Sequence, residues 1–298
     1  MHADRPSITA TLVAAVRALY TSMPEPYRIA PDPVAESLIP APFALPARAL
    51  ARSPWVAPLI HRGLGLATFG TTYHAALRTR AIDDAVREAV LAGIAQIVVL
   101  GAGLDSRALR MPELRGARVF EVDHPSSQRY KIERLTRSEA PVPEREKSGE
   151  VRRVPIDFEK HRLSDLLPAA GFQVDGQSFW IWEGVTVYLT LEAIESTLRD
   201  IASLSSPGSL LAVTYTPPIA GRMGRLLPAL RGAFRVLGEP IRTLLQPGEM
   251  AGLLDGAGFS LRADDAAPDW VERYWPFELR ERVRVVERLA IAERCSHP

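Results

Sequence analysis

Two hydrophobic patterns alternate along the chain and predict its fold class. Short runs of β-branched and aromatic residues, bounded by glycine, proline or charged residues, are typical of buried strands. Seven segments have this pattern: 96–100, 118–123, 151–156, 179–182, 210–215, 259–263 and 285–292. Their alternation with segments of helical spacing predicts an α/β fold with a mostly parallel sheet. The seventh is ambiguous, because residues 282–293 also fit an amphipathic helix by spacing alone.

The N-terminal part of the chain has helical spacing instead. Helices are predicted over Ile8–Thr21, Pro33–Leu38 and Thr72–Ala92, with proline-rich connections between residues 40 and 58. The apolar start of the first helix lacks a basic leader and a small-residue cleavage site, which favours an amphipathic helix over a signal peptide. We expect residues 1–75 to form a helical cap on a core of residues 76–298.

Composition narrows the class of protein. Of the 298 residues, 47% are hydrophobic, which is ample for the core of one elaborated domain. The net charge of +1 gives no reason to expect a nucleic acid or an anionic membrane as a partner. A single cysteine, Cys295, excludes an internal disulfide, and no cluster of His and Cys has metal-ligand spacing. No stretch approaches the roughly 20 apolar residues that span a bilayer, so we expect a cytoplasmic, metal-free protein.

The first predicted strand runs directly into a glycine turn, Gly101-Ala-Gly103. Glycine permits a tight turn and a close approach of the backbone to a nucleotide-type cofactor. A dinucleotide site would have a third glycine where this chain has Ser106, and the carboxylate of Asp105 would oppose a bound pyrophosphate. The second predicted strand ends at Asp123, where a carboxylate reaches ribose hydroxyls in this architecture. The turn therefore favours a cofactor that has a ribose and no phosphate.

Five ordered motifs surround this turn. They are Arg78-Thr-Arg80-Ala-Ile-Asp-Asp84, Leu100-Gly-Ala-Gly-Leu-Asp105, Phe120-Glu-Val-Asp-His-Pro125, Ile156-Asp-Phe158 and Trp182-Glu-Gly-Val-Thr-Val-Tyr-Leu189. In order and spacing they resemble the leucine carboxyl methyltransferase family of S-adenosylmethionine-dependent enzymes, which includes bacterial O-methyltransferases of small molecules. The resemblance is strongest from Arg78 to Leu189 and weak before it. It implies a Rossmann-like class I methyltransferase fold with a seven-stranded sheet, and it favours a strand at 285–292.

The resemblance also implies seven cofactor contacts. They are Arg78, Gly101, Gly103, Asp123, Asp157, Phe158 and Glu183. Asp123 would bind the ribose hydroxyls, with Glu121, two residues earlier on the same side of the strand, as the alternative acid. Asp157 and Phe158 would hold the adenine. Phe158 replaces the family's more usual leucine, a change that keeps an apolar wall.

Charged residues would hold the methionine part of the cofactor. Glu183 directly follows an apolar strand, and a carboxylate there would be costly to bury without a partner, which the cofactor's ammonium or sulfonium offers. Arg78 matches the family's arginine near the methionine carboxylate, where a guanidinium can bind bidentately, and Arg80 is the alternative. The family also uses an N-terminal lysine; this chain has none before Lys131, and Arg28 could substitute.

Two substrate chemistries remain open. A carboxylate, with a pKa of about 4, is ionised at neutral pH and needs no general base, so Arg78 and Tyr188 would only have to orient it. A hydroxyl, with a pKa of about 10 or higher, benefits from a base, for which His124 and His74 are the candidates. Tyr215 matches a family tyrosine position and would line the substrate pocket or donate a hydrogen bond there.

Residues 217–247 form an insertion that resembles the family's substrate cover. Apolar residues alternate there with five arginines, and Glu239 is the only acid, so the insertion could receive a hydrophobic molecule with an anionic group. We expect an S-adenosylmethionine-dependent O-methyltransferase that forms a methyl ester on a small metabolite, such as a polyketide or peptide-derived acid. The alternatives are methylation of a hydroxyl or of a protein C-terminal carboxylate. From other classes, an NAD-dependent oxidoreductase, disfavoured by Ser106, and a noncatalytic cofactor sensor remain.

Overall fold

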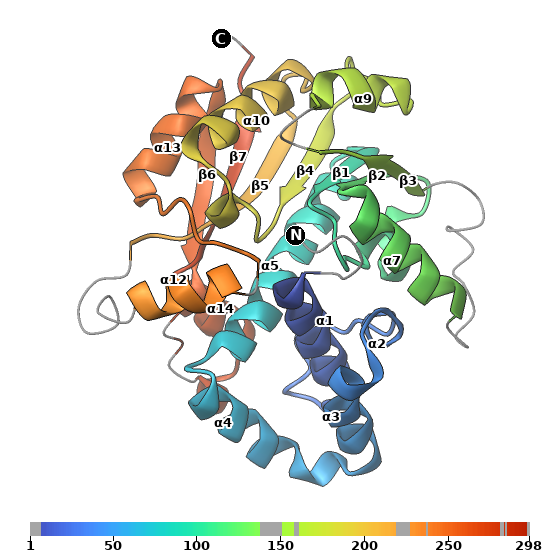
Figure 1. Ribbon diagram of the computed structural model, residues 1–298, viewed down its shortest axis with the longest axis vertical. Helices are drawn as coiled ribbons and strands as arrows, with labels where there is room; N and C mark the ends of the chain where they lie inside the picture. The colour runs from blue at the N-terminus through green and yellow to red at the C-terminus, as the bar shows by residue number, and fades with distance from the viewer. Residues whose placement is uncertain are drawn as a thin grey trace.

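The computed structural model describes residues 7–137, 151–157, 161–218, 227–236, 238–280, 283 and 285–296. One sheet of seven strands carries helices on both faces (Figure 1). The strands are β1 (Gln96–Leu100), β2 (Arg118–Asp123), β3 (Val151–Pro155), β4 (Ser178–Trp182), β5 (Leu210–Tyr215), β6 (Phe259–Ala266) and β7 (Arg288–Arg294). Their order across the sheet is β3-β2-β1-β4-β5-β7-β6. The seven predicted strands are confirmed, with small changes at their ends.

The ladder directions settle the ambiguous last segment. Strands β1 to β5 pair in parallel, whereas β7 runs antiparallel between β5 and β6. The C-terminal segment is therefore a strand and not an amphipathic helix. Because β1 to β5 are parallel, the loops that follow them meet at one edge of the sheet, where ligands bind in open α/β folds.

Alternate side chains of the strands enter two apolar layers, as the period of two requires. On one face, residues such as Val99 and Ile181 pack with α5 (Thr71–Leu91) and α14 (Ala267–Tyr274). On the other face, residues such as Val98 and Trp180 pack with three helices. These are α9 (Leu163–Ala169), α10 (Leu191–Ser203) and α13 (Pro247–Gly256). Burial of such a side chain contributes about 1.5–3 kcal/mol, so both layers fix the sheet that carries the site.

Five helices precede the sheet. Besides α5 they are α1 (Ile8–Thr21), α2 (Ala35–Leu38), α3 (Ala41–Arg52) and α4 (Ala57–Ala67), with the 3-10 turn η1 (Pro54–Val56) before α4. Helix α3 and the start of α4 lie where proline-rich connections were predicted, and that prediction is wrong; the rest of α4 lies where no element was predicted. Pro42 and Pro58 occupy the first turns of these helices, where a missing N–H breaks no helical hydrogen bond. In Figure 1, α3 and α4 form the lower end of the molecule, remote from the sheet.

Short elements complete the described structure. They are α6 (Arg107–Arg110), α7 (Pro125–Arg137), α12 (Leu227–Val236) and the 3-10 turns η2 (Pro112–Leu114), η3 (Thr186–Tyr188) and η4 (Phe277–Leu279). Within the described ranges, no helix combines the length and the apolar character needed to cross a bilayer.

Candidate functional site

The turn after β1 has a backbone that favours glycine. Gly101 and Gly103 have φ angles of 65° and 44°, in the left-handed region. A Cβ on Gly101 would also lie 2.5 Å from a methyl group of Val185, in the loop after β4. The N–H groups of Gly101 and Ala102 donate to the carbonyl of Val122, at 2.8 and 3.2 Å. These contacts hold the loops after β1, β2 and β4 together at one edge of the sheet.

The carboxylate of Asp123, at the end of β2, lies beside this turn. It accepts hydrogen bonds from the backbone N–H of Gly103 and from that of His124, the latter at 2.6 Å. Burial raises the pKa of Asp123, and these two hydrogen bonds act against the shift. A carboxylate has about four acceptor positions, so further acceptor capacity remains for hydroxyl donors. The alternative acid, Glu121, is paired instead with Lys131 at 2.8 Å.

Glu183, directly after β4, is bound by two arginines. Its Oε1 accepts from Arg78 on α5 at 2.9 Å, and its Oε2 accepts from Arg107 on α6 at 2.8 Å. Burial alone would raise the pKa of Glu183, but Arg107 and Arg78 lower it to about 2. Glu183 is therefore an ionised carboxylate throughout the physiological pH range.

These contacts belong to a larger buried ion network. Arg107 also binds Asp83 at 2.8 Å and Asp105, and Asp83 in turn binds Arg110 at 2.7 Å. The network consists of Arg17, Asp32, Arg78, Asp83, Asp105, Arg107, Arg110, Glu183 and Glu287, whose side chains are at most 15% exposed. It holds one more carboxylate than guanidinium groups. Buried charges are stable only when they are paired, so each member fixes the position of its neighbours.

Two network members that position the predicted residues, Arg107 and Glu287, were not predicted from the sequence. Glu287, just before β7, binds Arg78 and lies 2.6 Å from Nε2 of His74. Burial would raise the pKa of Glu287, but Arg78 and His74 lower it to about 2, whereas burial lowers the pKa of His74. Glu287 lies 209 residues from Arg78 in the chain, so no local motif joins the two. Arg107 lies next to the glycine turn, and its position there was the only available signal.

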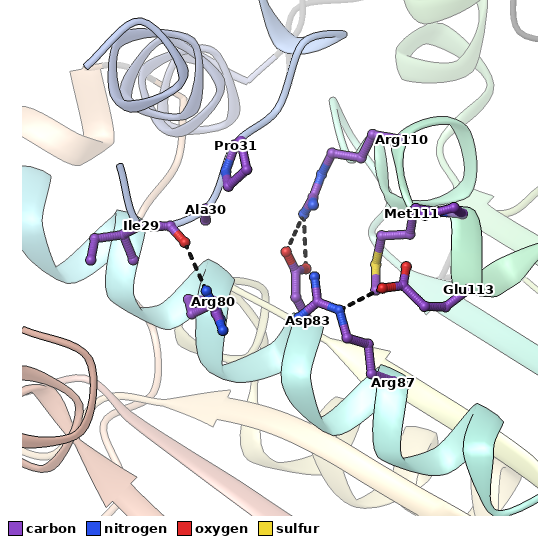
Figure 2. A pocket seen from close by; sticks show the side chains of 10 residues that line it. Ile29, Ala30, Pro31, Arg80, Asp83, Arg87, Arg110, Met111 and Glu113 are labelled. Carbon is purple, nitrogen blue, oxygen red and sulfur yellow. Dashed lines mark hydrogen bonds and ion pairs between the residues drawn. The ribbon is translucent and has the colours of Figure 1, made fainter. Parts of the chain in front are cut away.

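The two candidate arginines of α5 point to different places. Arg78 reaches the ion network, whereas Arg80 binds Asp84 at 3.0 Å and lines a cavity of about 230 Å³ (Figure 2). The cavity's other arginines are paired with carboxylates, including Arg87 with Glu113 at 2.7 Å. The cavity lining includes none of the seven predicted cofactor residues. Of these two arginines, Arg78 is the one that contacts Glu183.

The two predicted tyrosines lie in different surroundings. Tyr188, in η3, has its hydroxyl 3.5 Å from that of Thr9. Burial raises the pKa of Tyr188 to about 12, and its hydrogen bond with Thr9 acts against this shift. Tyr215 donates its hydroxyl to Asp264 of β6 at 2.7 Å, and burial raises the pKa of Tyr215 above its usual range.

Asp157 follows β3, and its N–H donates to Nδ1 of His161 at 3.3 Å. Phe158 lies outside the described residues, as do Arg222 and Arg225 of the insertion. Arg28 is exposed and donates to the carbonyl of Met23 at 3.0 Å. In the described part of the chain, no three His, Cys, Asp or Glu side chains form a group that could hold a metal ion.

Solved structures share the whole fold. A "putative methyltransferase" of Thermobifida fusca YX matches with a TM-score of 0.60, at 16% identity, over 99% of this chain and 96% of that one. A DUF574 family protein from Streptomyces avermitilis MA-4680 matches with a TM-score of 0.59, at 14% identity, over 97% and 98% of the two chains. With the strand order and the glycine turn after β1, these matches define the fold of a class I S-adenosylmethionine-dependent methyltransferase.

The leucine carboxyl methyltransferase family model matches residues 10–202, so the chain belongs to that family. The match includes the N-terminal helices, where the motif resemblance was weak. Two relatives carry the name "Putative S-adenosyl-L-methionine-dependent methyltransferase". One, from Mycolicibacterium gilvum (strain PYR-GCK), is 33% identical over 78% of this chain and 71% of the relative. The other, from Mycobacterium avium (strain 104), is 32% identical over 83% and 79%. The protein is an S-adenosylmethionine-dependent methyltransferase.

Proposed function

We propose that this methyltransferase forms a methyl ester on the carboxylate of a small, hydrophobic metabolite. The observation that carries the proposal is the state of the candidate bases. Burial lowers the pKa of His74, which lies 2.6 Å from Glu287, and Nδ1 of His124 lies 2.7 Å from the hydroxyl of Ser126. Burial raises the pKa of Tyr188 to about 12, so its hydroxyl stays protonated. A substrate that is already ionised needs none of these groups as a base.

The same seven residues would hold the cofactor. Gly101 and Gly103 would leave the backbone close to it, and Asp123 would accept from the ribose hydroxyls with its remaining lone pairs. Asp157 and Phe158, after β3, would hold the adenine. These assignments use the loops that the parallel strands bring to one edge of the sheet.

Arg78 and Glu183 would hold the methionine part of the cofactor, the guanidinium binding its carboxylate and Glu183 its ammonium. The charge of the ion network supports this assignment, because the network has one net negative charge while its neighbour His74 is neutral at neutral pH. The cofactor carries two positive charges and one negative charge. A preformed site of opposite charge favours its binding.

The chain's own task in catalysis would be binding and orientation. When bound, S-adenosylmethionine supplies an electrophilic methyl group on a sulfonium. A substrate carboxylate held near Arg78 and Tyr188 would form the new O–C bond while the C–S bond breaks, and the electron pair of that bond stays on sulfur. No proton moves, and both reactants lose charge, so a pocket that excludes water favours the step. Alignment at about 3–3.5 Å can supply much of the barrier reduction.

Residues 1–75 and 217–247 would enclose the substrate as a cap and a lid on the core of residues 76–298. Glu239, the lid's only acid, is 8% exposed and accepts from the N–H of Ile8 at 2.9 Å and the hydroxyl of Thr9 at 2.7 Å. The negative charge of Glu239 therefore stabilises the N-terminus of α1. The described arginines of the lid, Arg231, Arg235 and Arg242, would then face an anionic substrate without a competing carboxylate, and Tyr215 would line the pocket wall.

Methyl transfer with a labelled methyl group tests the proposal. Purified protein is incubated with labelled S-adenosylmethionine and paired hydrophobic carboxylic acids and alcohols of equal carbon skeleton. Base then releases volatile labelled methanol from methyl esters and not from methyl ethers. Label released from the acids alone supports the proposal. Base-stable label on the alcohols would replace it with hydroxyl methylation, and label on intact protein acceptors would replace it with protein carboxyl methylation.

The substitution His124→Ala separates the two small-molecule chemistries. Carboxyl methylation should keep kcat within about twofold of the wild type, because no base is needed, whereas loss of a general base costs about 10²–10⁴-fold. The measurement is the initial rate with the acceptor that takes up most label in the paired screen, together with a thermal melt. A decrease in kcat of about 100-fold or more in a folded variant would argue for a hydroxyl substrate.

Glu183→Gln should weaken S-adenosylmethionine binding by about tenfold, because an amide keeps the size of the side chain but loses the charge that faces the ammonium. Calorimetry at neutral pH measures the change. The matched control is Glu195→Gln on α10, whose nearest cation, Arg199, lies 3.9 Å away on the surface. Equal cofactor affinity in the Glu183→Gln variant and this control would remove Glu183 from the site.

A further inference from the structure

The outer face of η1 and α4 exposes a stripe of large apolar side chains. Trp55, Leu59, Leu66 and Phe69 are 81%, 74%, 72% and 58% exposed. Leu59 and Leu66, seven residues apart, lie on the same side of α4, with Trp55 in η1 before the helix and Phe69 in the turn after it. The buried residues of α4 lie on the opposite side; they are Ala57, His61 and Gly65. Exposed apolar residues gathered in one place mark an interaction surface, whereas scattered ones do not.

Helix α3, which contacts η1, also exposes large apolar side chains, since Leu45 is 60% and Phe43 is 39% exposed. Exposed cationic side chains lie in the same stretch of the chain. Arg52 and Arg62 are exposed, and in the described residues neither forms an ion pair with a carboxylate. The chain has no acidic residue between positions 36 and 83. We call residues 43–69 of α3, η1 and α4 the cationic apolar face; it forms the lower end of the molecule in Figure 1.

We propose that the cationic apolar face docks on the surface of an anionic lipid bilayer. Exposed tryptophan, phenylalanine and leucine on and next to one helix, with arginines in the same stretch of chain, suit the boundary between headgroups and acyl chains. Arg52 and Arg62 can extend their stems along that boundary and reach lipid phosphates. The net charge of +1 conceals this local charge, because the acids that balance it lie elsewhere in the chain.

Charge also argues against a second copy of the chain as the occupant. A two-fold contact would place the same surface on both sides, with arginines facing arginines and no carboxylate within the face to pair them. An anionic bilayer offers both an apolar layer and negative charge. Docking there is separate from methyl transfer, and it would bring the protein to a place where hydrophobic acids accumulate.

Vesicle binding tests the proposal directly. The full chain is mixed with vesicles of phosphatidylcholine alone or with about 30% phosphatidylglycerol, then sedimented. Trp55 serves as an internal probe, because the other four tryptophans are at most 2% exposed. We expect binding to the anionic vesicles, with a blue shift of the tryptophan emission, and at least about tenfold weaker binding to the neutral ones. No binding to either vesicle would overturn the proposal.

Two variants locate the contact. Leu59→Asp with Leu66→Asp should lower anionic vesicle binding at least about tenfold, because two exposed apolar side chains that would enter the bilayer become charged. The matched control is Leu91→Asp, at an 85% exposed leucine at the end of α5, which should bind like the wild type. Equal binding by the double variant would overturn the proposal. So would a wild-type dimer that the double variant converts to a monomer without any vesicle binding.

Discussion

Asp123→Ala is expected to weaken S-adenosylmethionine binding by about 100-fold. Each hydrogen bond from a hydroxyl to an ionised carboxylate contributes about 1.5–3 kcal/mol, and the ribose offers two such hydroxyls. The carboxylate is held at the glycine turn by the N–H of Gly103 and of His124, so it is oriented before any ligand arrives. Isothermal calorimetry on wild type and variant measures the affinity ratio.

The control for this substitution is Asp123→Asn, which keeps the size of the side chain. Its amide oxygen still accepts one hydrogen bond, so the loss should be smaller, about tenfold. Glu121→Gln tests the alternative acid on the same strand. Because Glu121 is paired with Lys131, its loss should lower stability and leave cofactor affinity within about twofold in protein that remains folded. If Glu121→Gln lost more cofactor affinity than Asp123→Ala, Glu121 rather than Asp123 would be the acid that binds the ribose hydroxyls.

Arg107→Met is expected to lower the free energy of unfolding by about 3–5 kcal/mol, since it leaves buried carboxylates without their shared guanidinium. Arg107 is 2% exposed, and it binds Asp83, Asp105 and Glu183. Urea denaturation at neutral pH measures the change. The expected control is Arg199→Met, at a 64% exposed arginine on α10, with a change within about 0.5 kcal/mol.

The Arg107→Met effect should depend on pH in a defined direction. The pKa of Glu183 is lowered in the folded protein from 4.5 to about 2, so its ion pairs contribute fully above pH 4.5. That contribution is lost as the pH falls toward 2, because the carboxylate then takes up a proton. The stability difference between wild type and variant should therefore shrink over this interval. If the stability difference between wild type and Arg107→Met stayed constant from pH 7 down to about pH 3, lost packing rather than lost charge would explain the lower stability of the variant.

Local sequence patterns predicted the strands and the glycine turn because each depends on neighbouring residues. The β-branched run Ile97-Val-Val99 before Gly101 is typical of a strand that is buried on both faces. The positive φ angles at Gly101 and Gly103 are a local requirement of the turn, which glycine meets. The helices α3 and α4 were missed for an equally local reason. Proline was treated as a break, although in the first turn of a helix it is compatible with helical backbone.

The ion network could not be predicted in the same way. Arg78, Glu183 and Glu287 come from three regions of the chain, and only the fold of the sheet brings them together. The motifs identified Arg78 and Glu183 one by one, but not the fact that they bind each other. Glu287 has no distinctive neighbours, and its role depends on β7 lying antiparallel beside β5. Tertiary contacts of this kind are fixed by topology and not by local propensity.

The most direct test of the account is a calorimetric titration of the purified protein with S-adenosylmethionine, S-adenosylhomocysteine and NAD, repeated with Asp123→Ala. The account predicts that both adenosyl ligands bind the wild type, that NAD does not, and that the variant loses about 100-fold in affinity for both. Binding of NAD, or unchanged affinity for the adenosyl ligands in a folded Asp123→Ala variant, would contradict the cofactor site described at the glycine turn.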